Sequence, residues 1–256
     1  MEKTVSVQNI SKTFTLSKKQ MKIEKSNSKK KVAVNGLSFD AYRGEIFGLL
    51  GPNGAGKTTT LRCISTLIKP DSGDILIDNY SVVKEEEKVR SSIGFLTSDL
   101  KLEDFFTPNY LYDYFSKLHG IDPEVSEARK EKMFQRFGID KFREVKVGEL
   151  STGMRQKVQL VVSIVHNPEV IIFDEPTNGL DVLTARAVTD YLKELRNEGK
   201  TIIVSTHIFS LVEKICDRVG IIIEGKLKVV DTLSKIIGDK LSLEDYFFDL
   251  VEGGSN

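Results

Sequence analysis

The chain's fold is decided by one short stretch, Gly51-Pro52-Asn53-Gly54-Ala55-Gly56-Lys57-Thr58. This stretch fits the pattern G-x-x-x-x-G-K-[ST] at every defined position. It follows the apolar run Glu45–Leu50, which is typical of a buried strand, and it opens the helix-like segment Thr58–Ile68, which stops before Pro70. The order of strand, glycine-rich loop and helix is the context in which this pattern cradles phosphate groups.

Each residue type in this loop suits a phosphate ligand. Glycines let the backbone curl until its N–H groups, and the N-terminus of the helix behind them, face an anion. Lys57 is expected to reach β- and γ-phosphate oxygens, and the Thr58 hydroxyl is expected to bind Mg²⁺. The pattern alone predicts a phosphate-binding ATPase or GTPase, the alternative being a chance glycine turn before a helix. The residues that we expect to contact a nucleotide here are Gly51, Pro52, Asn53, Gly54, Ala55, Gly56, Lys57, Thr58 and Thr59.

Strands and helices alternate along most of the chain, which favours an α/β fold with a parallel sheet. The segment Leu100–Val147 is rich in Lys, Glu and spaced aromatic residues and is expected to be mostly helical, as an inserted subdomain. A last helix is expected behind Ser242. The other predicted strands are Thr4–Ile10, Val32–Ala41, Gly73–Asn79, Ile93–Leu96, Val170–Phe173, Thr201–Ser205 and Val219–Ile223, and the other predicted helices are Leu183–Arg196 and Phe209–Cys216.

The composition argues against several classes of protein. Lys plus Arg and Asp plus Glu each total 37, so the chain lacks the positive excess typical of nucleic-acid-binding proteins, and we expect no nucleic acid partner. Cys63 and Cys216 lack metal-ligand spacing and are expected to be buried thiols. The start of the chain has no secretory apolar core, and no apolar run reaches the roughly 18 residues of a membrane span. We therefore expect a cytoplasmic protein that reaches a membrane through a partner.

The segment Lys18–Lys31 is strongly basic, with seven lysines against the single Glu24. Its low hydrophobicity predicts a solvated, mobile loop between two strands. A contact with anionic lipid headgroups is the alternative that the lysines allow.

Two further carboxylates follow the predicted strand Val170–Phe173. Asp174 and Glu175 stand at the C-terminal end of that strand, the edge at which parallel sheets bind ligands. Asp174 is expected to hold Mg²⁺, and Glu175 to orient and deprotonate the attacking water of a phosphoryl transfer. Alone, such a pair is more often a solvated turn, and only its combination with the glycine-rich loop favours catalysis.

The heptapeptide Leu150-Ser151-Thr152-Gly153-Met154-Arg155-Gln156 opens another helix-like segment before that strand. Here the chain resembles the ABC ATPase family, because the heptapeptide is similar to the family's LSGGQ signature, with Met154 where glutamine is commonest. Ser151 and Gly153 at a helix N-terminus can present a hydroxyl and N–H groups to a γ-phosphate. The residues alone also fit a simple serine helix cap.

The resemblance extends to further positions. Asn178-Gly179-Leu180-Asp181 matches the family's D-loop, and Ser205-Thr206-His207 matches its switch histidine. Phe14 matches the aromatic residue that stacks on adenine, and it equally fits a core residue at a strand end. Ser98, followed by Asp99, replaces a glutamine that is common in the family. Both side chains are shorter than glutamine, so a contact with Mg²⁺ there would run through a water.

The resemblance implies a fold and an activity. The fold would be α/β, a P-loop NTPase (RecA-like) parallel-sheet core with an antiparallel β subdomain and an inserted α-helical subdomain. Residues 1–98 and 155–225 would form the ATP-binding core, 99–154 the helical signature subdomain, and 226–256 a C-terminal hairpin and helix. The chain would bind ATP and Mg²⁺ and would hydrolyse ATP, with Glu175, His207 and Lys57 as its catalytic residues.

The same resemblance implies partners. Since each motif occurs once, the chain would form a head-to-tail homodimer or pair with a related ATPase subunit, and Ser151 and Gly153 of one protomer would close the ATP site of the other, with Asp181 nearby. A separate integral membrane permease would hold the chain at the cytoplasmic face. The contexts 151–157 and 175–181 resemble ABC-2-type exporters, and 94–99 with 106–111 resembles the sodium-extruding subgroup.

Two alternatives belong to other functional classes. A soluble ABC ATPase would act on ribosomes or DNA without a permease, but such relatives usually carry two ATPase units or a long coiled coil, which this chain lacks. The second alternative is a purely regulatory subunit that binds nucleotide without hydrolysing it. Loss of hydrolysis is not expected, because Lys57, Asp174, Glu175 and His207 are all present.

Overall fold

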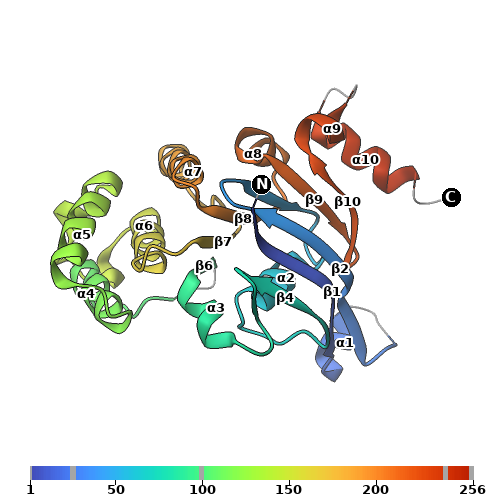
Figure 1. Ribbon diagram of the computed structural model, residues 1–256, viewed down its shortest axis with the longest axis horizontal. Helices are drawn as coiled ribbons and strands as arrows, with labels where there is room; N and C mark the ends of the chain where they lie inside the picture. Colours follow the sequence, from blue (N-terminus) through green and yellow to red (C-terminus); the bar gives the residue numbers. More distant parts are fainter. Residues whose placement is uncertain (1, 24–26, 98–100, 239–241, 254–256) are drawn as a thin grey trace.

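The computed structural model describes residues 2–23, 27–97, 101–238 and 242–253, and these residues form two β-sheets with helices around them (Figure 1). The larger sheet contains β3 Ile46–Leu50, β6 Ile93–Thr97, β7 Val170–Asp174, β8 Thr201–Thr206, β9 Arg218–Ile223 and β10 Lys226–Thr232. Its order is β10-β9-β3-β8-β7-β6, and all neighbours are parallel except β10, which runs antiparallel to β9. Every residue of β3 and β7 is buried, as expected of parallel strands covered on both faces.

The smaller sheet is antiparallel and contains β1 Lys3–Thr15, β2 Lys30–Tyr42, β4 Ser72–Ile77 and β5 Tyr80–Ser81, in the order β2-β1-β4-β5. Its apolar face shares one core with the larger sheet, because Val5, Val7 and Ile10 belong to the same buried cluster as Phe47 of β3. The rings of Phe39 and Phe47 stack with their centroids 4.6 Å apart. The two sheets therefore pack as one body.

The helices surround the sheets, with α4 and α5 at the end of the molecule farthest from α1 (Figure 1). Their starts follow local rules: Thr107 and Asp122 cap α4 and α5 with side-chain hydrogen bonds, each followed by a proline at the first helical position. The bounds are α1 Lys18–Ile23, α2 Lys57–Ile64, α3 Glu86–Ser92, α4 Pro108–Leu118, α5 Pro123–Phe137, α6 Thr152–Ser163, α7 Val182–Asn197, α8 Phe209–Ile215, α9 Leu233–Ile237 and α10 Leu243–Gly253, with 3₁₀ turns at Asp140–Phe142 and Val147–Glu149.

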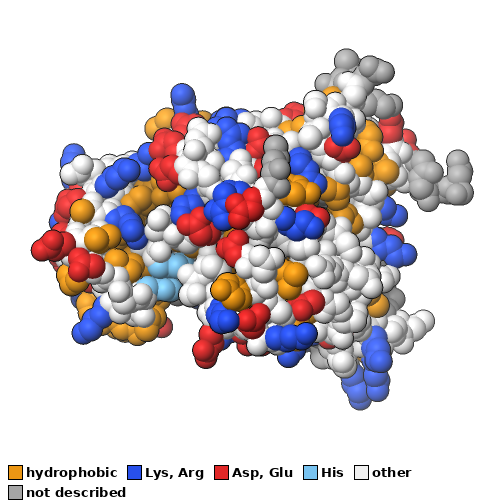
Figure 2. All heavy atoms as spheres, in the orientation of Figure 1, with side chains coloured by type: hydrophobic (Ala, Val, Ile, Leu, Met, Phe, Trp, Pro, Cys, Tyr) orange, Lys and Arg blue, Asp and Glu red, His pale blue; other side chains and the backbone are white. Residues whose placement is uncertain are grey.

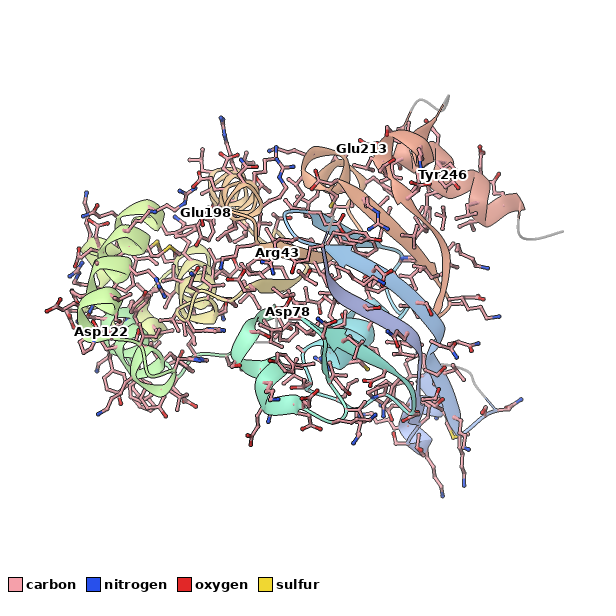
Figure 3. The ribbon with its side chains drawn as sticks, in the orientation of Figure 1. Arg43, Asp78, Asp122, Glu198, Glu213 and Tyr246 are labelled. Atoms are coloured by element: carbon pink, nitrogen blue, oxygen red, sulfur yellow. The ribbon has the colours of Figure 1, made fainter. Side chains whose placement is uncertain are left out.

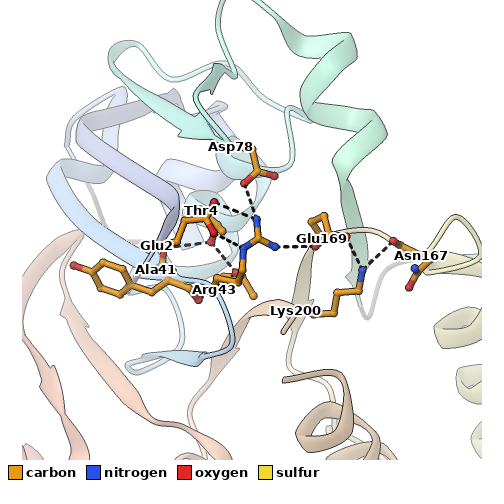
Figure 4. A network of polar contacts seen from close by, with 10 residues as sticks. Glu2, Thr4, Ala41, Arg43, Asp78, Asn167, Glu169 and Lys200 are labelled. Atoms are coloured by element: carbon orange, nitrogen blue, oxygen red, sulfur yellow. Dashed lines mark hydrogen bonds and ion pairs between the residues drawn. The ribbon is translucent and has the colours of Figure 1, made fainter. Parts of the chain in front are cut away.

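A polar network joins the two sheets at the N-terminal ends of β7 and β8 (Figure 4). The Arg43 guanidinium lies 2.7 Å from a carboxylate oxygen of Glu2 and 3.0 Å from one of Glu169. Lys200 Nζ lies 2.8 Å from the other oxygen of Glu169. Glu2 directly precedes β1 of the smaller sheet, and Glu169 directly precedes β7 of the larger one. The network therefore connects the two sheets at the N-terminal end of β7, whereas Asp174 lies at its C-terminal end.

The C-terminal helix α10 packs on α8 through a hydrogen bond and aromatic contacts (Figure 3). The backbone N–H of Leu243 donates to Glu213 Oε1 at 2.7 Å, and the rings of Phe209 and Phe247 meet edge to face at 5.2 Å. Since only His207 and Ile208 separate β8 from α8, this packing supports the strand end that His207 follows.

The α/β class, its parallel sheet and the mostly helical segment are confirmed for the described residues. The expectation of a plain loop at Lys18–Lys31 is wrong, because α1 forms within it and β2 already starts at Lys30. The helix after the glycine-rich loop ends at Ile64, four residues earlier than predicted, because Thr66 adopts φ 61° and turns the chain.

The domain division stays a prediction, and its boundary at 154/155 falls inside α6. Among the described helices, none combines the length and the apolar character needed to cross a membrane.

Candidate functional site

The glycine-rich loop joins the end of β3 to the start of α2, as its sequence predicts. Gly54 and Gly56 have φ values of 81° and 107°, in the left-handed region that favours glycine. A Cβ at Gly51 would collide with the carbonyl oxygen of Ile222, and one at Gly56 with that of Ala33. The loop therefore lies against neighbouring backbone so closely that only glycine fits at these two positions.

Lys57 begins α2 with a buried side chain that turns back into the loop. Its Nζ donates to the carbonyl oxygens of Gly51 at 2.6 Å and Pro52 at 3.1 Å. Burial lowers the pKa of the Lys57 ammonium, while the charges of Glu175 and Asp174 oppose that shift. The ammonium therefore lies against the carbonyls of the glycine-rich loop, on the side that faces Glu175.

The two acidic residues stand at the C-terminal end of β7, facing the loop. Asp174 is buried, and its carboxylate accepts a hydrogen bond from the Ser205 hydroxyl on β8. Glu175 adopts φ 54°, a left-handed conformation that costs energy for a residue with a side chain, and its N–H donates to the Ser205 carbonyl at 3.0 Å. The two carboxylates have different partners, since that of Asp174 is bound by Ser205 and that of Glu175 by Thr206 and His207.

The Glu175 carboxylate is held on three sides. His207 Nδ1 lies 2.9 Å from Oε1, the Thr206 hydroxyl donates to Oε2 at 3.3 Å, and Lys57 Nζ lies 3.8 Å from Oε1. The three predicted catalytic residues, Glu175, His207 and Lys57, thus come together from three segments of the chain. Such an arrangement can orient a carboxylate to act as a general base near a phosphate.

A cleft of about 370 Å³ opens over the glycine-rich loop. Phe14, at the end of β1, lines this cleft with its ring exposed, so it fits the predicted contact with a base better than a core position. Sequence reasoning missed four other lining residues, Leu16, Gln20, Lys31 and Ala33. Gln20 and Lys31 belong to the segment that was expected to be a mobile loop. The lining residues are Phe14, Leu16, Gln20, Lys31, Ala33, Asn53, Gly54, Gly56, Lys57, Thr58, Thr59, Asp174 and Glu175.

The signature residues lie apart from this cleft. Ser151 caps α6 by accepting a hydrogen bond from the Met154 N–H at 3.3 Å, and Asp181 caps α7. Gly153 faces Asp181, since a Cβ on Gly153 would meet its Oδ2 at 3.4 Å. Neither Ser151, Gly153 nor Asp181 is among the residues that line the cleft in the described part of the chain. Within one copy, the predicted nucleotide contacts therefore form two separate groups.

Two of the three predicted metal ligands lie at the cleft. Thr58 and Asp174 both line the cleft, whereas Ser98 lies outside the described residues. No cluster of three or more His, Cys, Asp or Glu side chains suited to a metal occurs within the described ranges. Mg²⁺ in proteins usually keeps several of its waters and is bound by one or two carboxylates together with phosphates of the substrate. The Asp174 carboxylate and the Thr58 hydroxyl fit this mode of binding.

Comparisons with known proteins agree with this geometry. Residues 34–178 match the family model described as ABC transporter. The chain is 40% identical over 202 residues to the ABC transporter ATP-binding protein NatA of Bacillus subtilis, covering 78% of this chain and 82% of NatA. It is 37% identical to the Nod factor export ATP-binding protein I of Burkholderia orbicola, covering 77% of this chain and 64% of that relative.

Solved structures give the same result. A structure described as the ATP binding subunit of an ABC transporter superposes with a TM-score of 0.85 at 26% identity, covering 97% of this chain and 99% of that one. The dimeric ABC transporter cassette MJ0796 superposes with a TM-score of 0.77 at 24% identity, over 89% and 98% of the two chains, which supports the fold. With the family model matched over more than half of its residues, this chain belongs to the ABC transporter family and is an ABC-type ATPase.

Proposed function

We propose that this chain is the ATPase subunit of an exporter, that it binds Mg-ATP over residues 51–59, and that it hydrolyses ATP as a head-to-tail dimer. The observation that carries the proposal is the placement of the Glu175 carboxylate by His207 and Thr206, next to Lys57 and the glycine-rich loop. Bound Mg²⁺ would neutralise phosphate charge beside Thr58 and Asp174. Glu175 would orient the attacking water and take its proton.

The dimer follows from the separation of the two groups of nucleotide contacts. Ser151 and Gly153 lie outside their own chain's cleft, so they would complete the site of a second copy. Val182 and Leu183, at the start of α7 beside Asp181, are 84% and 79% exposed, unusually high for apolar side chains. A second copy, or a related subunit, would cover them when ATP closes the dimer.

The proposed permease contact is an aromatic surface on the helical segment, made of Phe105, Tyr110, Tyr114 and Leu118. All four side chains are exposed, and the Tyr110 ring stacks on Phe106 at 4.5 Å and lies 6.2 Å from Tyr114. Exposed apolar surface of this kind typically serves an interaction. A permease bound here would place the chain at the cytoplasmic face of the membrane.

An exporter is proposed because segments 151–157 and 175–181 resemble ABC-2-type exporters, and because one relative is named a Nod factor export protein. Sodium is the first cargo to test, given the resemblance of segments 94–99 and 106–111 to the sodium-extruding subgroup. The measurement is sodium efflux from vesicles that contain the permease and either the wild-type chain or its Glu175→Gln variant. Equal efflux with both chains would exclude sodium as the cargo.

The core of the proposal is tested by Glu175→Gln, which keeps the shape of the side chain and removes the base. We expect ATP binding to persist, steady turnover to fall by about a hundredfold or more, and a dimer to accumulate with ATP. Turnover near the wild-type rate would remove Glu175 from its role.

The partner is tested with Tyr110→Ala/Tyr114→Ala, which should keep ATP hydrolysis and lose co-purification with a membrane protein. Co-sedimentation of the wild-type chain with ribosomes would instead favour the soluble class.

A further inference from the structure

Residues 16–31, which join β1 to β2 and include the first two residues of β2, are called the insert here, and its described part, 16–23 and 27–31, contributes to one wall of the nucleotide cleft. Three of its residues, Leu16, Gln20 and Lys31, line the cleft together with Phe14 and the glycine-rich loop. Leu16 is buried, while Gln20 is exposed. The insert thus lies at the end of the cleft that Phe14 lines, and α1 lies at the edge of the cleft.

The described part of the insert is held in place by specific contacts. The Leu16 N–H donates to the Lys29 carbonyl at 2.7 Å, which closes the base of the insert. The Ser17 N–H donates to Gln20 Oε1 at 2.8 Å, and the Gln20 N–H donates to Ser17 Oγ at 3.3 Å. These two bonds form a reciprocal cap that starts α1 where it faces the cleft.

The wall carries a strong positive charge. Residues 16–23 and 27–31, the described part of the insert, contain no Asp or Glu, and their lysines are Lys18, Lys19, Lys22, Lys29, Lys30 and Lys31. Figure 2 shows Lys and Arg side chains gathered around the position of α1, at the lower right of the molecule. A concentrated patch of one sign beside a cleft raises the local concentration of ligands of the other sign.

We propose that this insert is an electrostatic guide for the nucleotide, in which the α1 lysines speed the entry of the anionic triphosphate into the cleft. The inference rests on the proposed function and adds a role in nucleotide association for residues outside the catalytic group. The neutral net charge of the whole chain makes a local patch important, because no general excess of positive charge attracts the nucleotide. A nucleotide is favoured over a lipid headgroup as the ligand because the insert lines the cleft itself.

The test is the variant Lys18→Gln/Lys19→Gln/Lys22→Gln in the full chain. Stopped-flow association of a fluorescent ATP analogue, mant-ATP, is measured at about 20 mM and at about 0.5 M salt. We expect the association rate constant to fall about three- to tenfold at low salt and the difference to disappear at high salt, since salt screens exposed charges. The kcat at saturating ATP should stay unchanged.

The matched control is Lys117→Gln/Lys132→Gln/Lys141→Gln, which changes the net charge equally at exposed positions of the α4 and α5 region. Its association rate should stay within about twofold of wild type. An insert variant that behaves like this control at both salts would overturn the proposal, as would equal slowing at both salts. Unchanged nucleotide kinetics with lost binding to phosphatidylserine vesicles would overturn it in favour of a lipid contact. A wild-type chain that binds no mant-ATP would instead refute the proposed function.

Discussion

His207 Nδ1 lies 2.9 Å from Glu175 Oε1, and this contact ties the end of β8 to the end of β7. The same carboxylate oxygen faces Lys57 Nζ at 3.8 Å. The histidine is thus placed to fix the orientation of the proposed base. The backbone of Glu175 is strained at φ 54°, and its N–H is bound by the Ser205 carbonyl at 3.0 Å.

The first prediction concerns His207→Ala. We expect kcat to fall about a hundredfold, because a misoriented base loses much of the typical contribution of general base catalysis, while the affinity for mant-ATP stays nearly unchanged. Phosphate release at steady state and mant-ATP titration measure the two effects. His119→Ala, at the end of α4, is the control and should keep its activity. A His207→Ala enzyme with wild-type kcat would show that Glu175 is oriented without His207.

The second prediction concerns Lys57→Met, which keeps the apolar stem and removes the ammonium. ATP affinity should fall about tenfold or more, because a charge-assisted hydrogen bond to phosphate is worth roughly 1.5–3 kcal/mol. The change also leaves the Gly51 and Pro52 carbonyls without their Nζ donor, so we expect a moderate loss of thermal stability without nucleotide. Mant-ATP titration and thermal unfolding check both. Unchanged affinity would mean that the backbone amides hold the phosphates without Lys57.

The third prediction compares two glycines of the loop, both in the left-handed region. Gly54→Ala adds a Cβ with no atom within 4 Å, whereas the Cβ of Gly56→Ala collides with the Ala33 carbonyl oxygen. Backbone strain is common to both variants, so their difference isolates the collision. We expect Gly56→Ala to lower the free energy of unfolding by about 2 kcal/mol more than Gly54→Ala and to abolish ATP binding. Urea unfolding measures the difference, and equal losses would show that the loop can move away from Ala33.

The sequence predicted the parts of the site whose chemistry follows from local rules. The loop 51–58, the acidic pair and His207 each follow a predicted strand, and parallel strands bring their C-terminal ends to one edge. The sheet explains why Glu175 and His207 meet, because β7 and β8 are neighbours, with Asp174 opposite Ser205. The positive φ of Glu175 was not predictable, since it depends on the hydrogen bond to the Ser205 carbonyl.

The basic insert shows where sequence reasoning reached its limit. Low hydrophobicity and charge argue for a loop, but the serine and glutamine at positions 17 and 20 form a capping pair that starts a helix. That signal is present in the sequence, but the prediction of a loop rested on the lysines alone. The hydrogen bond from Leu16 to Lys29 could not be predicted from the local sequence pattern, because it depends on where β2 begins. The short α3 was missed as well, since its seven residues carry only one buried apolar side chain, Val89.

The last prediction concerns His166, which links the helical segment to the sheet. Its ring stacks on that of His119 at 4.1 Å between centroids, and its Nε2 lies 2.9 Å from the Ile93 carbonyl oxygen. Burial, helped by the nearby His119, Arg129 and Lys200, lowers the pKa of His166 to about 4. Burial also lowers the pKa of His119.

The sign of the effect follows from proton linkage. In the unfolded chain His166 titrates near its ordinary pKa of about 6.5, so between about pH 6.5 and pH 4 the unfolded state binds more protons than the folded state. The stability that neutral His166 contributes is therefore complete above about pH 6.5 and is lost as the pH falls towards 4. Between pH 7 and pH 5 the loss should be about 1–2 kcal/mol.

His166→Gln tests this, because an amide can still donate to the Ile93 carbonyl and does not titrate in this range. We expect urea unfolding of the variant to show a smaller loss of stability between pH 7 and pH 5 than the wild type. His119→Gln is the matched control, with a smaller expected effect because His119 is more exposed than His166. An identical pH dependence in the wild type and in His166→Gln would assign the acid sensitivity to other groups, and the stack would then serve packing alone.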